Sequence, residues 1–130
     1  MANLRRINQE DLRNHNLSVT LDTLLRAQKP MSRADLAKET GLTKATLSLL
    51  ASMLIESGVV QEGEPVVSTT YGRPSTPLEI RGGSIAGIGL QINTDGYGCL
   101  ALDLNGDTLG REWVSEDMTG TDPYEILSLI

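Results

Sequence analysis

Residues 31–58 have the sequence MSRADLAKETGLTKATLSLLASMLIESG, which is typical of two short helices that cross at a tight turn. Ala37 is small enough to lie in the crossing, and Gly41 can adopt a turn conformation that bulkier residues resist. The apolar contacts between the two helices would come from Leu36, Leu42, Leu47 and Leu50. The sequence therefore predicts a helix-turn-helix.

Both helices of this pair carry residues that favour helix ends. Ser32 can cap the first helix, with Asp35 three residues later, and Thr43 can cap the second. Gly58 suits the left-handed position that follows a helix, so we expect the second helix to end there. DNA recognition by this second helix is the leading hypothesis, and a helical hairpin in some other all-α domain is the alternative.

The flanking residues predict a winged form of the motif. A further helix is expected at about 16–28, where leucines recur at helical spacing. After the pair, strand-like runs at 59–62 and 77–80 flank a segment rich in Gly, Ser, Thr and Pro. Together these parts predict a winged helix-turn-helix domain over about residues 10–81.

Charge is distributed unevenly along the chain. Residues 1–81 hold ten Lys or Arg and nine Asp or Glu, whereas residues 82–130 hold one Arg and eight Asp or Glu, so the net charge of −6 arises in the second part. Residues 26–48 nevertheless have a local charge of +3, from Arg26, Lys29, Arg33, Lys38 and Lys44 against Asp35 and Glu39. This local excess permits DNA binding.

Composition excludes several other classes of protein. No run of residues approaches the length of a membrane span or a signal peptide, so we expect a cytoplasmic protein without membrane contact. Cys99 is the single cysteine, which excludes a disulfide framework or a Cys/His zinc cluster and favours a buried structural thiol. His15 is also single, and we expect no catalytic role for it.

Residues 82–130 change from helical periodicity to strand-like alternation. Asp95-Gly96 and Asn105-Gly106 separate the apolar runs, and both dipeptides favour hairpin turns. We expect antiparallel strands at about 85–93, 97–104 and 108–115.

A helix is expected after these strands. Asp122 and Pro123 are typical of an N-cap and a first helical position, and apolar residues continue to Ile130. A domain rarely ends on the apolar face of a helix, and one unfinished helix cannot cover both faces of a sheet. We therefore expect this chain to be the front part of a longer protein.

Seven short motifs carry a resemblance to a known family: Asn8-Gln9, Leu17-Ser18-Val19, SRADLA at 32–37, TGLTKAT at 40–46, Gly72-Arg73-Pro74, Ile88-Gly89-Leu90 and LDLNG at 102–106. In this order they resemble the transcriptional-regulator branch of the ROK family (repressors, open reading frames and kinases). The resemblance covers the whole chain. It implies an α+β protein with a three-helix winged helix-turn-helix at residues 1–81. Residues 82–130 would form the first antiparallel strands and first helix of an actin-like ATPase domain, which is truncated here.

The resemblance also implies a function. Such a protein would be a sequence-specific transcriptional regulator, a repressor of carbohydrate-use genes that a sugar effector relieves. The effector site and a structural zinc would lie in a part of the domain that is absent here, so no cofactor or metal is expected within these residues.

One segment departs from the sugar kinases of that family. In those enzymes the first strand leads into an Asp-x-Gly-Gly-Thr turn, whose Asp assists metal and proton handling and whose glycines let backbone amides approach ATP phosphates. The corresponding residues are Gln91-Ile92-Asn93-Thr94-Asp95, with an amide for the carboxylate and side chains for both glycines. We therefore expect no kinase activity.

Candidate DNA contacts lie on the outward face of the second helix of the pair, while Leu47, Leu50, Ala51, Leu54 and Ile55 should face inward. Thr43 or Lys44 can hold a phosphate at the helix N-terminus, Thr46 and Ser48 can bond to base edges, and Ala45 allows close approach. Leu49 would touch thymine methyl groups or pack against another protein element. For each residue a solvated helix face is the alternative.

Two arginines complete the set of candidate contacts. Arg33 belongs to the local basic excess, and Arg73 lies between Gly72 and Pro74 in the expected wing, where its guanidinium could enter a minor groove over A·T pairs. Without DNA we expect the wing to be a solvated, disordered loop. A homodimer is expected, because helix-turn-helix proteins usually present two recognition helices to DNA.

Three functions from different classes remain. The first is a DNA-binding regulator of the ROK type. The second is a ROK sugar kinase with an added N-terminal module, against which Gln91 is the main feature. The third is a winged helix used for protein contact, which would be consistent with the acidic balance and with Leu49.

Overall fold

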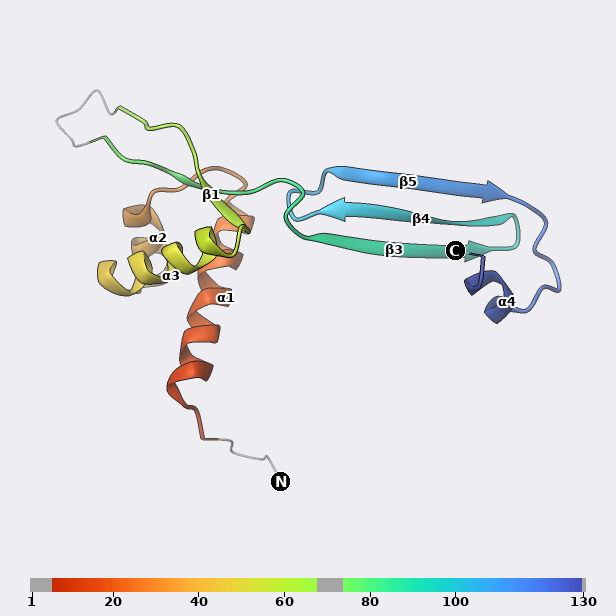
Figure 1. Cartoon of the computed structure of the whole chain (residues 1–130), viewed down its shortest axis with the longest axis horizontal. Coiled ribbons are helices and arrows are strands. Elements are labelled where there is room, and N and C mark those ends of the chain that lie inside the picture. Colours follow the sequence, from red (N-terminus) through yellow and green to blue (C-terminus); the bar gives the residue numbers. More distant parts are fainter. Residues whose placement is uncertain (1–5, 68–73, 130) are drawn as a thin grey trace. The chain divides into compact units, whose positions relative to one another are not determined.

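The structure is a computed structural model of the 130-residue chain and describes residues 6–67 and 74–129. It falls into two compact units, divided after Arg81 (Figure 1). We describe each unit by itself.

The described part of the first unit holds three helices and a pair of short strands. They are α1 (Gln9–Ala27), α2 (Arg33–Thr40), α3 (Lys44–Glu56), β1 (Val60–Glu62) and β2 (Leu78–Ile80). The two strands are antiparallel, with Val60 opposite Ile80 and Glu62 opposite Leu78. The predicted helix-turn-helix is present as α2 and α3.

Helix α1 begins seven residues earlier than the leucine spacing predicted, so that prediction was wrong at the N-terminus. A capping box sets the start: the Asp11 backbone N–H donates to Asn8 Oδ1 at 2.8 Å, and the Asn8 N–H donates to Asp11 Oδ2 at 3.2 Å. The first two turns are mostly exposed and polar, so apolar periodicity gave no sign of them. At the other end Gln28 adopts a left-handed conformation with φ 50°.

The helix-turn-helix has the predicted end signals. Ser32 and Asp35 form a reciprocal capping box at the start of α2, and Thr43 caps α3 by accepting the Thr46 N–H. Gly41 ends α2 with φ 73°, and its N–H donates to the Ala37 carbonyl at 3.0 Å. A left-handed residue is therefore required at this turn, which explains the glycine.

One core lies beneath all the elements of the first unit. Its buried members are Leu24, Met31, Leu36, Ala37, Leu47, Ala51, Leu54, Val60 and Leu78. Met31 also forms an antiparallel bridge to Leu78, with its N–H donating at 3.0 Å and its carbonyl accepting at 2.7 Å. The segment between α1 and α2 is thereby fixed to β2, so the helices and the base of the wing form one packed body.

The second unit is a three-stranded antiparallel meander followed by a short helix. Its elements are β3 (Ala86–Asn93), β4 (Gly96–Asp103), β5 (Thr108–Ser115) and α4 (Pro123–Leu127). The predicted strands are confirmed, and Asp122 caps α4 through the Tyr124 N–H at 3.0 Å, as predicted. Helix α4 ends at Leu127, and Ile130 lies outside the described residues.

The first hairpin turn differs from the prediction by one residue. Asn93 pairs with Gly96, so Thr94 and Asp95 form the turn and Gly96 begins β4. A Cβ at Gly96 would meet the Val114 carbonyl oxygen and lie 2.9 Å from Trp113 Cζ2. The glycine is therefore needed for close packing of β5 against β4 as well as for its φ of 154°.

Apolar side chains remain exposed on the outer strands of this sheet. Ile88 and Leu90 of β3 are 73% and 51% exposed, and Leu109 of β5 is 50% exposed. Cys99 on β4 is half-buried, so the prediction of a buried thiol was wrong, because the sheet is not covered on both faces by the described residues.

Candidate nucleic-acid interface

Helix α3 has one buried face and one exposed face, as its sequence predicted. Leu47, Leu50, Ala51 and Leu54 are buried, whereas Lys44, Ala45, Ser48, Leu49 and Ser52 are exposed. Because its buried side is part of the core, α3 cannot rotate about its own axis. Its outward residues are therefore held in fixed positions relative to one another. The leucine at position 49 is 62% exposed in the middle of this face.

The N-terminus of α3 is organised by two threonines. Thr43 Oγ1 accepts the Thr46 N–H at 3.2 Å, and the two hydroxyl oxygens are 2.9 Å apart in a second hydrogen bond. Thr46 is half-buried. Its hydroxyl is therefore engaged with the cap, a contact that the spacing of three residues could have indicated but that we did not predict. Lys44 is exposed beside unpaired backbone N–H groups, an arrangement that favours a phosphate.

Arg33 lies at the first position of α2 and is engaged with an acidic residue. Its Nη2 donates to Glu62 Oε1 on β1 at 2.8 Å, and the two side chains are 33% and 49% exposed. The structure therefore places this candidate in an ion pair that joins α2 to the wing. Sequence inspection missed Glu62, because the two residues are 29 positions apart and only the fold brings them together.

The two arms of the wing stay paired beyond β1 and β2. The Gly63 N–H donates to the Pro77 carbonyl at 2.9 Å, and Val66 and Ser75 form an antiparallel bridge. The expectation of a disordered loop is therefore wrong for these arms, which backbone hydrogen bonds hold as a ribbon (Figure 1). Arg73 lies outside the described residues.

Asp35, in the first turn of α2, is hydrogen-bonded to the N-cap residue Ser32. The hydroxyl of Ser32 donates to Asp35 Oδ2 at 2.7 Å, and the Ser32 N–H donates to the same oxygen at 3.2 Å. These bonds, together with the nearby charges of Lys29 and Lys38, lower the pKa of Asp35 below its usual value. The capping carboxylate therefore remains ionised at neutral pH and stabilises the start of α2.

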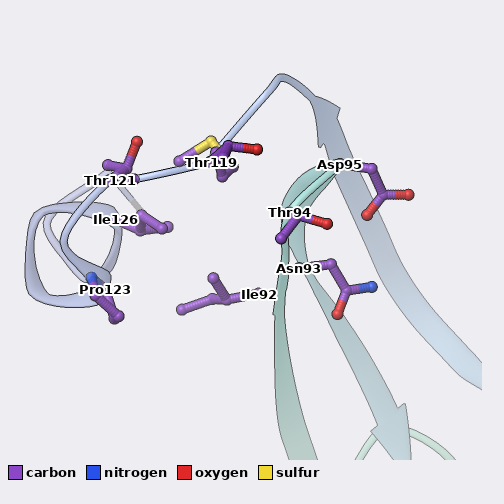
Figure 2. A pocket seen from close by; sticks show the side chains of 10 residues that line it. Ile92, Asn93, Thr94, Asp95, Thr119, Thr121, Pro123 and Ile126 are labelled. Atoms are coloured by element: carbon purple, nitrogen blue, oxygen red, sulfur yellow. The ribbon is translucent and has the colours of Figure 1, made fainter.

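An open hollow of about 830 Å³ lies in the second unit, where β3 ends. Figure 2 shows Ile92 pointing towards Ile126 and Pro123 of α4. The Thr94 carbonyl accepts the Met118 N–H at 2.8 Å, and the Asp95 carbonyl accepts the Glu116 N–H at 3.2 Å. Thr94 and Asp95 thus form a hairpin turn whose carbonyl groups accept hydrogen bonds from the chain after β5.

Residues 6–67 and 74–129 are the part of the chain that the structure describes. There, no group of three or more His, Cys, Asp or Glu side chains is placed to hold a metal ion. Within the same residues, no helix combines the length and apolar character needed to cross a membrane.

Comparison with known proteins gives concordant results for sequence and fold. Residues 20–64 match the IclR helix-turn-helix domain. The chain is 31% identical over 86 residues to the transcriptional regulators Rv0485 of Mycobacterium tuberculosis and Mb0495 of Mycobacterium bovis, a match covering 65% of this chain and 20% of each relative. The chain therefore spans about a fifth of the length of the curated relatives it matches.

A solved structure shares the fold. The crystal structure of a ROK family transcriptional regulator, a homologue of the E. coli MLC protein, superposes with a TM-score of 0.58 at 18% identity. The superposition covers 90% of this chain and 31% of that protein. Residues 20–64 are thus similar to the IclR helix-turn-helix domain, and the chain shares the α+β fold of the matching part of that ROK family transcriptional regulator.

Proposed function

We propose that this chain is the DNA-binding part of a transcriptional regulator and that residues 1–81 carry the DNA affinity. The observation that carries the proposal is the exposed face of α3, which is rigidly held and begins with a lysine beside a capped helix N-terminus. Phosphate binding at such an N-terminus would position the helix, and the outward side chains would then contact base edges. Residues 82–130 would begin a kinase-like domain.

Titration of labelled duplex DNA with α3 variants tests this proposal. Lys44→Ala should weaken binding to all sequences and reduce the slope of log affinity against log salt by about one unit. Arg111→Ala removes the same charge from an exposed position on β5 and serves as the matched control, which should bind like the parent chain.

Ser48→Ala tests base recognition separately. The Ser48 side chain is exposed, so its loss should leave the fold intact while changing the preference among sequences by about 1 to 3 kcal/mol. Thr46→Ala should act in the same direction, with an added effect through the Thr43 cap. If all three α3 variants bind like the parent chain, α3 does not recognise DNA and a role in protein contact is favoured.

We further propose that the whole protein regulates transcription without phosphorylating sugars. Gln91 stands where the kinases have a carboxylate, and Asn93 and Thr94 stand where they have glycines, so ATP phosphates would lack both a metal-binding acid and close backbone amides. ATP turnover by the full-length protein in the presence of hexoses should equal the protein-free rate. Sugar-dependent turnover would overturn this part of the proposal.

Regulation by a sugar belongs to the same proposal and rests on the ROK-like fold of the second unit. A repressor of carbohydrate-use genes in the cytoplasm would release its operator when the effector binds elsewhere in the protein. A panel of sugars added to a complex of the full-length protein with DNA should therefore contain at least one that lowers DNA affinity. No change with any sugar would contradict the proposed effector class.

A further inference from the structure

Leu49 is a large apolar side chain on a helix face that is otherwise polar or small and exposed to water. It is 62% exposed in the middle of α3, within one helical turn of Ala45, Ser48 and Ser52, which are exposed as well. Met53, one turn further along α3, is half-buried, so Leu49 is the one large apolar side chain of α3 that is mainly exposed, and its exposed neighbours are small. Protein interfaces depend on clusters of large anchors, so a groove wall with isolated methyl groups fits this surface better than a protein partner does.

The composition of α3 restricts how it could recognise a base. The helix, KATLSLLASMLIE from Lys44 to Glu56, contains no Arg, Asn or Gln, which are the residues that form paired hydrogen bonds with guanine or adenine. Its one lysine is at the first position, which suits a phosphate. The outward chemistry that remains consists of small hydroxyl groups and the apolar side chains of Ala45 and Leu49.

One feature of the major groove is complementary to an exposed leucine. The C5 methyl of thymine is the apolar group that base edges present there, and no other base carries it. We propose that Leu49 makes α3 selective for thymine by packing against this methyl in duplex DNA. The inference rests on the proposed DNA-binding function and adds the base that is selected and the residue that selects it.

The test uses the 130-residue chain and duplexes that it enriches from a random-sequence library. Each thymine of an enriched duplex is replaced in turn by deoxyuridine, which lacks only the methyl group and keeps the Watson–Crick pairing. At one thymine in each half-site we expect affinity to fall about fourfold, the effect of exposing one methyl-sized apolar group. The chain should also bind a duplex with 5-methylcytosine at that position more tightly than one with cytosine there.

Leu49→Ala assigns the effect to the side chain. Alanine favours helices as well as leucine does, and the position is exposed, so the variant should fold like the parent chain. It should bind the thymine and deoxyuridine duplexes equally. Leu12→Ala, which truncates a leucine that is 53% exposed on α1, is the matched control and should keep the fourfold difference of the parent chain.

The outcomes separate this inference from the function on which it rests. Sequence-selective binding with no loss at any deoxyuridine, or a loss that persists in Leu49→Ala, overturns thymine selection and leaves DNA binding in place. No enrichment of any duplex contradicts DNA binding itself and the inference with it. A Leu49→Ala chain that changes its sedimentation coefficient and keeps the methyl preference assigns Leu49 to a protein contact.

Discussion

The carboxylate of Asp103 accepts three backbone N–H groups, from Gly83 at 3.0 Å and from Asn105 and Asp107 at 2.9 Å each. These bonds join the segment before β3 to the turn between β4 and β5, and the side chain is buried. The Gly83 N–H, followed by that of Asp107, holds the pKa of Asp103 below its usual value of 3.8. The ionised carboxylate therefore stabilises the folded second unit.

This arrangement predicts a pH dependence of stability. Because the folded-state pKa is depressed, the stabilisation is fully present above about pH 4 and is lost as the pH falls through the folded-state value. Asp103→Asn should lower the free energy of unfolding at neutral pH. The difference in this free energy between the variant and the parent chain should become smaller as the solution is acidified. Urea unfolding at neutral pH and at about pH 3, followed by CD, measures both.

Asp107→Asn is the control for this experiment. It removes the same charge from the same turn. Asp107 donates to the Asp103 carboxylate through its backbone N–H, which the substitution retains. The variant should keep the pH response of the parent chain. A difference between Asp103→Asn and the parent that stays constant from neutral to acid solution would contradict the prediction.

Sequence inspection succeeded for residues whose partners are nearby in the chain. Ser32, Asp35 and Thr43 were predicted as caps because a capping side chain bonds within three residues. The ion pair of Arg33 with Glu62 could not be predicted, because only the fold brings these two distant residues together. The role of the α3 residues in DNA binding stays a prediction.

The central strand β4 depends on a glycine at its closest approach to β5. A Cβ on Gly98 would meet the Glu112 carbonyl oxygen and lie 2.9 Å from Trp113 Cε3, whereas a Cβ on Gly89 of β3 would meet nothing within 4 Å. Gly98→Ala should therefore destabilise the sheet by about 1 to 3 kcal/mol, because β5 must shift to admit the methyl. Urea unfolding followed by the fluorescence of Trp113, the single tryptophan, measures the change.

Gly89→Ala is the matched substitution in the neighbouring strand. It should leave stability unchanged or raise it by up to about 1 kcal/mol, because alanine reduces the freedom of the unfolded chain. Equal destabilisation by both substitutions would show that strand flexibility, and not packing against Trp113, explains the glycine.

Elements were predictable where one period dominates the sequence. The alternation of apolar residues located β3 and β4, and the turn dipeptides between the apolar runs indicated β5. The small and apolar residues of the helix-turn-helix located α3. The start of α1 was missed because its first turns are polar and a local capping box determines where it begins. The first hairpin turn was displaced by one residue because Gly96 belongs to β4, opposite Asn93, where packing against Trp113 requires a glycine as well as its φ of 154° does.

At the scale of the whole molecule, the exposed apolar side chains of the sheet predict self-association. Ile88, Leu90 and Leu109 are each at least half exposed on outer strands, and pairing with a second copy would remove them from water. Sedimentation should therefore show a homodimer at concentrations on the order of tens of micromolar, which a modest interface requires. Ile88→Lys should shift the equilibrium towards monomer, and a parent chain that is monomeric under these conditions would contradict the prediction.

The chain divides after Arg81 into two units whose interactions should respond to added salt in opposite directions. Residues 1–81 are nearly neutral overall with a local basic excess, so added salt should weaken their attraction to a polyanion. Residues 82–130 hold one Arg and eight Asp or Glu, so added salt should relieve the repulsion between two copies. Raising the ionic strength would thus weaken DNA binding and strengthen self-association. No single salt concentration would favour both DNA binding and self-association.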